Sequence, residues 1–201
     1  HGCVDGRLAL LAGSARQTPR ATVVRPHGPV LQQDARLGTR DFIRLMQVVM
    51  RRTEDEFIGL GRGTKSKPGT FSMMAHAVIN CPNLEKAIQR SAQFYRLVDL
   101  PMEIRLERGD RESRLILLPP VFESRENVLE TMVFISVRFW SWLTGRNLDP
   151  SAIHFDFAEP PQAAEFRRLF KGKVVYADRQ SAVVFPTSWL SLPLVQNPLS
   201  L

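Results

Sequence analysis

The sequence contains only two cysteines, Cys3 and Cys81, among its 201 residues. Two cysteines cannot build a disulfide framework, and their positions match no spaced metal-binding motif. A chain of this length can bury a core without such cross-links. The scarcity of cysteine therefore points to a reducing compartment, the cytoplasm.

Long apolar runs are also lacking. The longest extends from Val128 to Leu143 and contains Glu130 and Arg138, whereas a membrane-spanning helix needs about 20 consecutive apolar residues. The apolar stretch Leu8–Ala12 is too short for a secretory signal. The chain begins with His1 rather than Met, and we expect it to be a fragment.

The glycine-rich stretch GLGRGTKSKPG, Gly59–Gly69, is the nearest approach to a phosphate-binding loop. A Walker loop has the form G-x-x-x-x-G-K-[ST] and follows a strand, but Lys65 follows Thr64 and the preceding element is an expected helix. Thr64 also stands where the third glycine of a dinucleotide fingerprint could fall. We therefore interpret the stretch as a connector between helices, with Lys65 and Lys67 as solvated loop charges.

The sequence contains no arrangement that indicates an enzyme. Its four histidines, His1, His27, His76 and His154, lack the spacing of a metal site, and no G-x-S-x-G elbow occurs. The acidic run 54–56 is interpreted as a solvated helix end. We expect no catalytic residue, no metal and no cofactor.

Positive charge is plentiful but dispersed. The formal net charge is +7 and the isoelectric point is about 10.1, yet no block of five or six like charges occurs. Aromatic residues are not interleaved with the basic ones, so a single-stranded nucleic-acid platform is not indicated. Most of the charge is expected on solvated surface, and the alternative is one face that meets an acidic partner.

Hydrophobic spacing predicts an α+β fold. The first 38 residues are interpreted as irregular apart from a helical segment near Arg7–Ala12. The sheet is expected to be antiparallel or mixed, with a buried central helix and packed N-terminal helices. The predicted elements are an amphipathic helix from Asp41, a short helix over 70–80, a helix capped by Asn83 and ended by Pro101, a hairpin turning at Gly109-Asp110, a helix over Val128–Leu143, a strand over Ala152–Phe157, a helix over Pro161–Phe170, and strands at 173–177 and 182–186.

Arg138 is the candidate anchor for a ligand because it lies inside the most apolar predicted helix, where an unpaired guanidinium would be costly. An internal salt bridge to Glu130 or Glu103 is the alternative. Helical spacing places Thr131, Ile135, Arg138 and Trp142 on one stripe, which could also be plain core. The candidate ligand-binding residues are Thr131, Ile135, Arg138, Trp142, His76 and Tyr95.

His154 is interpreted as a surface or pocket-rim residue. It alternates with Ile153 and Phe155 along its predicted strand, so that His154 and Asp156 point away from the more apolar face.

Several motifs occur in an order that carries a family resemblance. They are N-L-x-x-A-I within FSMMAHAVINCPNLEKAIQRSAQFYRLV, L-T-G at the end of the central helix, P-x-x-I-x-F, E-F-R-R-x-F, V-V-Y-A and A-V-V-F-P. Over roughly Arg40–Leu194 the chain resembles the N-terminal effector-binding domain, of the "arabinose-binding" type, of AraC/XylS-type bacterial transcription regulators. Phe157 departs from the small polar residue or histidine common in the family, and 170–174 replaces its F-G-x-P-V turn.

The resemblance implies a ligand-sensing, dimerising regulatory domain of a cytoplasmic bacterial transcription factor. Its effector would be an apolar or anionic small molecule. DNA would be bound only by a C-terminal helix-turn-helix domain that this chain does not contain. We expect a poorly matched segment over 1–38 and the effector-binding domain over 39–201. The alternative is a ligand-free dimerisation or protein-interaction module.

Overall fold

A computed structural model of the chain describes residues 38–56, 65–98, 103–118 and 125–200. The expected helical segment near Arg7–Ala12 and most of the glycine-rich connector lie outside these ranges. The helices are α1 (Thr39–Thr53), α2 (Thr70–Val78), α3 (Leu84–Leu97), α4 (Arg125–Thr144) and α5 (Ala163–Arg167), the strands are β1 (Glu103–Glu107), β2 (Glu112–Leu118), β3 (Ala152–His154), β4 (Lys173–Val175) and β5 (Ala182–Pro186), and two short 3-10 helices are η1 (Thr187–Ser191) and η2 (Pro198–Ser200).

The five strands form one mixed sheet in the order β1-β2-β5-β3-β4. The pair β3 and β4 is parallel, and the other neighbouring strands are antiparallel. The predicted α+β fold with a mixed sheet is therefore confirmed, and so is the hairpin. Residues on one face of the sheet are buried, whereas the other face of β1 carries the exposed side chains of Glu103, Arg105 and Glu107.

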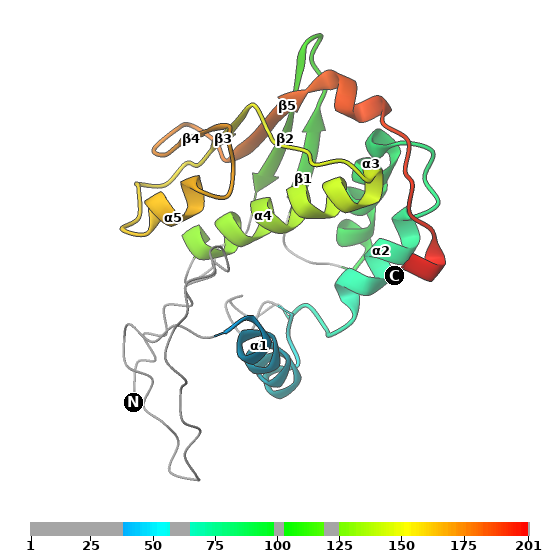
Figure 1. Cartoon of the computed structure of the whole chain (residues 1–201), viewed down its shortest axis with the longest axis vertical. Helices are drawn as coiled ribbons and strands as arrows, with labels where there is room; N and C mark the ends of the chain where they lie inside the picture. The colour runs from blue at the N-terminus through cyan, green and yellow to red at the C-terminus, as the bar shows by residue number, and fades with distance from the viewer. Residues whose placement is uncertain (1–37, 57–64, 99–102, 119–124, 201) are drawn as a thin grey trace.

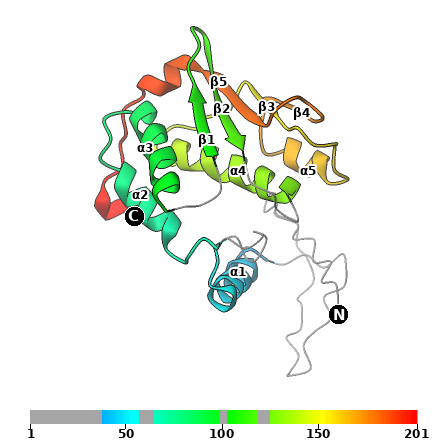
Figure 2. The same cartoon turned by 180° about the vertical axis from the view of Figure 1, so that it is seen from behind.

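The central helix α4 crosses the buried face of the sheet (Figure 1), as the view from behind also shows (Figure 2). Its side chains Leu129, Val133 and Val137 are almost fully buried, and they share one core with the strand residues Ile153 and Phe185. This burial of apolar area is the main source of the fold's stability. The helix ends at Gly145, whose φ of 62° lies in the left-handed region that favours glycine.

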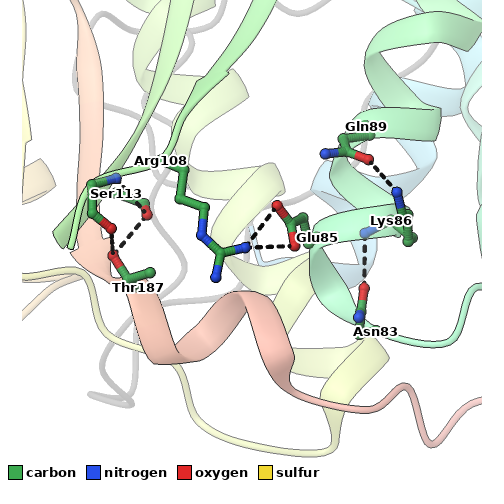
Figure 3. Close-up of polar contacts among 8 residues, drawn as sticks. Asn83, Glu85, Lys86, Gln89, Arg108, Ser113 and Thr187 are labelled. Atoms are coloured by element: carbon green, nitrogen blue, oxygen red, sulfur yellow. Dashed lines mark hydrogen bonds and ion pairs between the residues drawn. The ribbon is translucent and has the colours of Figure 1, made fainter. Parts of the chain in front are cut away.

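Helices α2 and α3 pack together beside α4 and the hairpin (Figures 1 and 2). Asn83 caps α3 as predicted, because its side-chain oxygen accepts a hydrogen bond from the backbone N–H of Lys86 at 3.0 Å. Glu85 then accepts two hydrogen bonds from Arg108 at the end of the hairpin, at 3.0 and 3.2 Å (Figure 3). The start of α3 is thereby attached to the sheet.

The hairpin turn is held from the other side by η1. The hydroxyls of Ser113 and Thr187 lie 2.8 Å apart, and Thr187 donates to the carbonyl of Gly109 at 2.8 Å (Figure 3). A Cβ added at Gly109 would lie 2.2 Å from the carbonyl oxygen of Glu112. The turn therefore requires a residue without a side chain at this position.

Helix α1 differs from the others because none of its residues is buried. It stands away from the sheet and α4 in both views (Figures 1 and 2). The amphipathic pattern predicted a helix here and the helix is present, but Ile43 and Val48 are about half exposed, at 49% and 52%. Packing by α2 and α3, rather than by α1, covers the core.

The segment 192–196 is attached to the ends of two core helices. The carbonyl of Leu192 accepts from the N–H of Leu84, where α3 begins. The N–H of Val195 donates to Leu143, and the side-chain amide of Gln196 donates to the carbonyl of Trp142, where α4 ends. Movement of α3 relative to α4 would therefore strain this segment.

Candidate ligand-binding site

A hollow lies between α2, α3, the β1–β2 hairpin and α4. Its volume is about 40 Å³, and about 10–15 Å³ measured in this way is the least that holds one water molecule. The lining residues are Phe71 and Met74 from α2, Ile88, Ser91 and Tyr95 from α3, Ile104 from β1, Leu115 from β2, and Met132, Ile135, Ser136, Phe139 and Trp140 from α4. Five elements thus converge on one small, mainly apolar space.

Helical spacing explains which residues of α4 reach the hollow. Met132, Ile135, Ser136 and Phe139 recur at steps of three and four residues, and such positions share one face of a helix. The neighbouring stripe, which includes Val133 and Val137, is fully buried and faces the sheet. One helix therefore builds both the core and a wall of the hollow.

The opening of the hollow is formed by two aromatic side chains. The rings of Phe71 and Phe139 meet edge to face with their centroids 5.3 Å apart. Phe139 also stacks on Trp142 at 5.8 Å. Phe71 and Ile135 remain partly exposed, at 37% and 38%, so access from solvent lies on this side.

Besides the indole N–H of Trp140, the lining carries three hydroxyl groups, and they differ in how they are satisfied. The hydroxyl of Ser91 is engaged with the carbonyl of Ala87 at 2.9 Å and the sulfur of Met74 at 3.2 Å. The hydroxyls of Tyr95 and Ser136 have no hydrogen-bond partner among the described residues. Burial, together with the nearby Glu56 carboxylate, raises the pKa of the Tyr95 hydroxyl, which therefore stays protonated at neutral pH.

Glu56 organises the α2 side of the hollow. One of its carboxylate oxygens accepts from the N–H of Gly69 at 2.7 Å, and the other accepts from the N–H of Phe71 at 3.0 Å and from the hydroxyl of Ser66 at 3.3 Å. These N–H groups belong to the first turn of α2, whose Gly69 cap offers no side chain. A carboxylate at a helix N-terminus satisfies unpaired N–H groups and the helix dipole.

The neighbouring acidic residues correct the interpretation of 54–56 as a solvated helix end. Glu54 is exposed as expected, but Asp55 is only 1% exposed and accepts from the N–H of Ser66 at 2.8 Å. Glu56 is half-buried. The interpretation is therefore wrong for Asp55 and Glu56, because both carboxylates accept hydrogen bonds from residues 66–71. Lys65 is exposed as predicted, although its ammonium donates to the carbonyl of Thr53.

The structure brings two of the six predicted site residues, Tyr95 and Ile135, to the hollow. Thr131 is half-buried on α4 outside the lining, and Trp142 stacks behind Phe139. His76 is exposed on α2, with its Nδ1 2.8 Å from the carbonyl of Ser72.

Arg138 differs most from its predicted environment. It is exposed rather than buried, and its guanidinium donates to the carbonyl of Leu169 at 3.0 Å and lies over the rings of Phe134 and Phe170. The expected internal salt bridge is absent among the described residues, since Glu130 accepts from the Tyr176 hydroxyl and Glu103 pairs with Arg105. The buried residues of α4, which include Val133 and Val137, lie on one face of the helix, and Arg138 lies outside that face, so its long side chain reaches solvent.

Sequence reasoning did not single out most residues of the hollow. Phe71, Met74 and Ser91 come from segments whose apolar spacing predicted only a helix. Ser136, a polar residue in an otherwise mainly apolar helix, is a signal that could have pointed to this position. The hollow itself depends on the packing of α2 and α3 against α4, which spacing within one helix does not specify.

A second group of polar residues surrounds β3, at the other end of the sheet. Arg125 and Asp156 form a two-pronged ion pair, with N–O distances of 2.8 and 2.5 Å, and Ser181 donates to Asp156 at 2.6 Å. Burial alone would raise the pKa of Asp156, but these two partners more than offset it and hold the pKa below its usual value. His154 pairs with Asp178 and is half-buried, in agreement with a rim position.

These polar groups are satisfied by one another, so they form a structural network. Among the residues that the structure describes, no cluster of three or more His, Cys, Asp or Glu side chains could hold a metal ion. Within the same ranges, no helix is long and apolar enough to cross a membrane. Cys81 is unpaired and buried.

Comparison with known proteins places the chain in a class. A sequence model described as the arabinose-binding domain of AraC transcription regulators, N-terminal, matches residues 15–194. The chain belongs to this family, as the resemblance had indicated, and is a ligand-sensing regulatory domain of a transcription factor. The match begins before residue 39, within the segment 1–38 that the resemblance did not cover.

One characterised relative is the ornithine utilization regulator of Pseudomonas aeruginosa. The two sequences are 24% identical over 172 residues, which cover 84% of this chain and 49% of the relative. The chain thus spans about half the length of that regulator.

Proposed function

We propose that this domain senses its effector in the hollow between α2, α3, the hairpin and α4. The observation that carries the proposal is the Tyr95 hydroxyl. Tyr95 is only 7% exposed, and its hydroxyl has no hydrogen-bond partner among the described residues. No fully enclosed side-chain nitrogen or oxygen of the described residues lacks a partner, so this hydroxyl is open to a hydrogen bond. An effector oxygen that accepts it adds about 0.5–1.5 kcal/mol to binding.

Binding is transmitted through the helices that line the hollow. Because α3 and α4 both contribute walls and both are hydrogen-bonded to 192–196, an effector that favours one spacing of these helices also favours one position of that segment. On the opposite side, Phe71 connects the hollow to Glu56, which lies three residues after the end of α1 at Thr53. The effector would thus shift the population between two arrangements of the domain.

The output of this shift lies in the rest of a longer protein. The relative extends well beyond the region matched here, and in our proposal a C-terminal helix-turn-helix domain binds DNA while this domain controls it. Such a regulator would act in the bacterial cytoplasm and have no catalytic activity.

A ligand screen that compares the wild type with a variant whose hollow is filled by a larger side chain tests the proposal. Thermal unfolding of the chain is measured against a panel of metabolites, first for the wild type and then for Ser136→Leu, which places extra carbon atoms in the hollow. Ser72→Leu is the matched control, because Ser72 lies on the exposed side of α2. We expect a ligand that raises the melting temperature of the wild type and of Ser72→Leu but not of Ser136→Leu. An undiminished shift in Ser136→Leu would refute the assignment of the hollow.

The alternative function, a dimerisation or protein-interaction module, is favoured by one observation. Helix α1 buries no residue and exposes the apolar side chains of Ile43 and Val48, which a second copy could cover. Sedimentation velocity of the chain tests this: we expect a dimer that Val48→Glu dissociates and Gln47→Glu, an equal charge change at the next exposed position, does not. A monomer in all three samples would exclude this homodimer.

A further inference from the structure

We infer that the hollow takes an uncharged, mainly apolar ligand with one hydrogen-bonding oxygen, and that Tyr95 donates a hydrogen bond to this oxygen. The inference rests on the proposed function of the same site and specifies the chemical class of its ligand.

The lining contains no charged side chain. Nine of its twelve residues are apolar, and the other three are Ser91, Ser136 and Tyr95. Moving an ionised group from water into such surroundings costs far more than moving a neutral one, unless a counter-charge is present. The lining therefore selects against both carboxylates and ammonium groups.

The two nearest charged candidates do not change this conclusion. Arg138, the cation that an anionic effector would need, is exposed, does not line the hollow, and is engaged with Leu169 and two aromatic rings. The carboxylate of Glu56 already accepts three hydrogen bonds at the start of α2. Its negative charge acts on the Tyr95 hydroxyl and would repel an anionic ligand at that end.

Tyr95 offers the hollow a hydrogen-bond donor. No fully enclosed side-chain nitrogen or oxygen of the described residues lacks a partner, so the unpartnered Tyr95 hydroxyl must face open space. Ser91 already has partners in Ala87 and Met74. The hydroxyl of Ser136 is also unpartnered among the described residues, and it can accept or donate at the α4 wall. An alcohol, ketone, ester or amide oxygen satisfies this pair.

The volume limits the ligand to a small molecule. About 40 Å³ is room for a few water molecules, and the partly exposed Phe71 and Ile135 at the opening can turn outward to admit a short chain. Five-carbon compounds therefore serve as probes. Pentan-1-ol, pentylamine and pentanoate share one chain and differ at neutral pH only in the neutral, cationic or anionic head group.

Two methionines in the hollow provide a local readout. Met74 and Met132 line it, whereas Met73 is adjacent in sequence but 62% exposed. In NMR spectra of the chain with ¹³C-labelled methionine methyl groups, we expect pentan-1-ol to shift the Met74 and Met132 signals saturably and to leave Met73 unchanged. Pentylamine and pentanoate should bind at least about tenfold more weakly at the same methyl groups.

The role of Tyr95 is tested separately. Tyr95→Phe removes a hydroxyl that has no partner, so the fold should be retained. We expect it to weaken pentan-1-ol binding about fivefold, as for the loss of one hydrogen bond, and to leave binding of 1-chlorobutane, which is similar in size but is a poor acceptor, unchanged. An unchanged affinity for pentan-1-ol would overturn the role of Tyr95.

The outcomes separate this inference from the function on which it rests. If pentylamine or pentanoate shifts Met74 and Met132 as strongly as pentan-1-ol, the ligand class is wrong, while the hollow remains the effector site. If none of the three probes shifts these signals, the inference is overturned, and the screen with Ser136→Leu decides the function independently. The wild-type series alone is sufficient for these two decisions, so they do not depend on the folding of any variant.

Discussion

Replacing Glu56 by glutamine should destabilise the protein, because Glu56 caps α2 from outside the helix. Its two oxygens accept from the N–H groups of Gly69 and Phe71 at 2.7 and 3.0 Å. In glutamine one of the two positions is an NH₂ group, which cannot accept, so at least one N–H loses its partner. Loss of a cap is worth about 1 kcal/mol, and loss of a negative charge beside a helix N-terminus about 0.3–1 kcal/mol more.

The expected destabilisation is therefore about 1.5 kcal/mol, which for a chain of this size lowers the melting temperature by about 3–6 °C. Urea unfolding followed by circular dichroism measures it. Glu112→Gln is the matched control, since it removes the same charge from an exposed strand position and should cost less than about 0.5 kcal/mol. Equal stabilities of the two variants would show that Glu56 does not cap α2.

Two further predictions concern stability. A Cβ added at Gly172 would lie 1.9 Å from the carbonyl oxygen of Pro150, so Gly172→Ala should cost about 2 kcal/mol or more in urea unfolding; at Gly38 the nearest atom is 3.8 Å away, and Gly38→Ala should cost far less. Burial raises the pKa of Glu130 above the 4.5 of an ordinary glutamate, so its contribution to stability is fully present below that value and is lost as the pH rises through the higher pKa of the folded state. Glu130→Gln keeps an acceptor for the Tyr176 hydroxyl and should gain stability relative to the wild type between pH 4 and 7; a pH-independent difference would contradict this.

Local signals in the sequence predicted most elements correctly. Asn83 as a cap and Pro101 as a stop gave the bounds of α3 within a few residues, because the cap is a contact between residues three apart. The alternation of Ile104 and Leu106 with charged residues likewise predicted β1 and its exposed face. Features that depend on residues close together in the chain could thus be predicted from the sequence.

The predicted bounds were less accurate for elements whose ends depend on residues distant in the sequence. The strand expected over Ala152–Phe157 ends at His154, because the chain after its parallel partner β4 turns at Ala177, where φ is 56°. The helix expected over Pro161–Phe170 is reduced to Ala163–Arg167, with tight turns on either side. In both cases the apolar spacing continues beyond the regular hydrogen bonding.

For the candidate site, too, local spacing was predictive and contacts between distant residues were not. Tyr95 and Ile135 were named from helical spacing and reach the hollow, but Arg138 was chosen because its sequence neighbours are apolar, and that does not determine whether a long side chain is buried. Glu56 could not be assigned, because its partners lie 10–15 residues further along the chain. The folded structure is needed to show that Glu56, which follows α1, caps the first turn of α2.

The contacts between 55–56 and Ser66 also mark a place where the chain could accept foreign sequence. The N–H of Glu56 donates to the carbonyl of Ser66 at 2.6 Å, and the N–H of Ser66 donates to Asp55 at 2.8 Å, so the two ends of the intervening stretch are joined at its base. For a flexible insert, doubling the length of a closed loop costs only about 0.6 kcal/mol. A fluorescent reporter inserted between these anchors would therefore sit beside the start of α2, next to the hollow, and could convert effector occupancy into an optical signal.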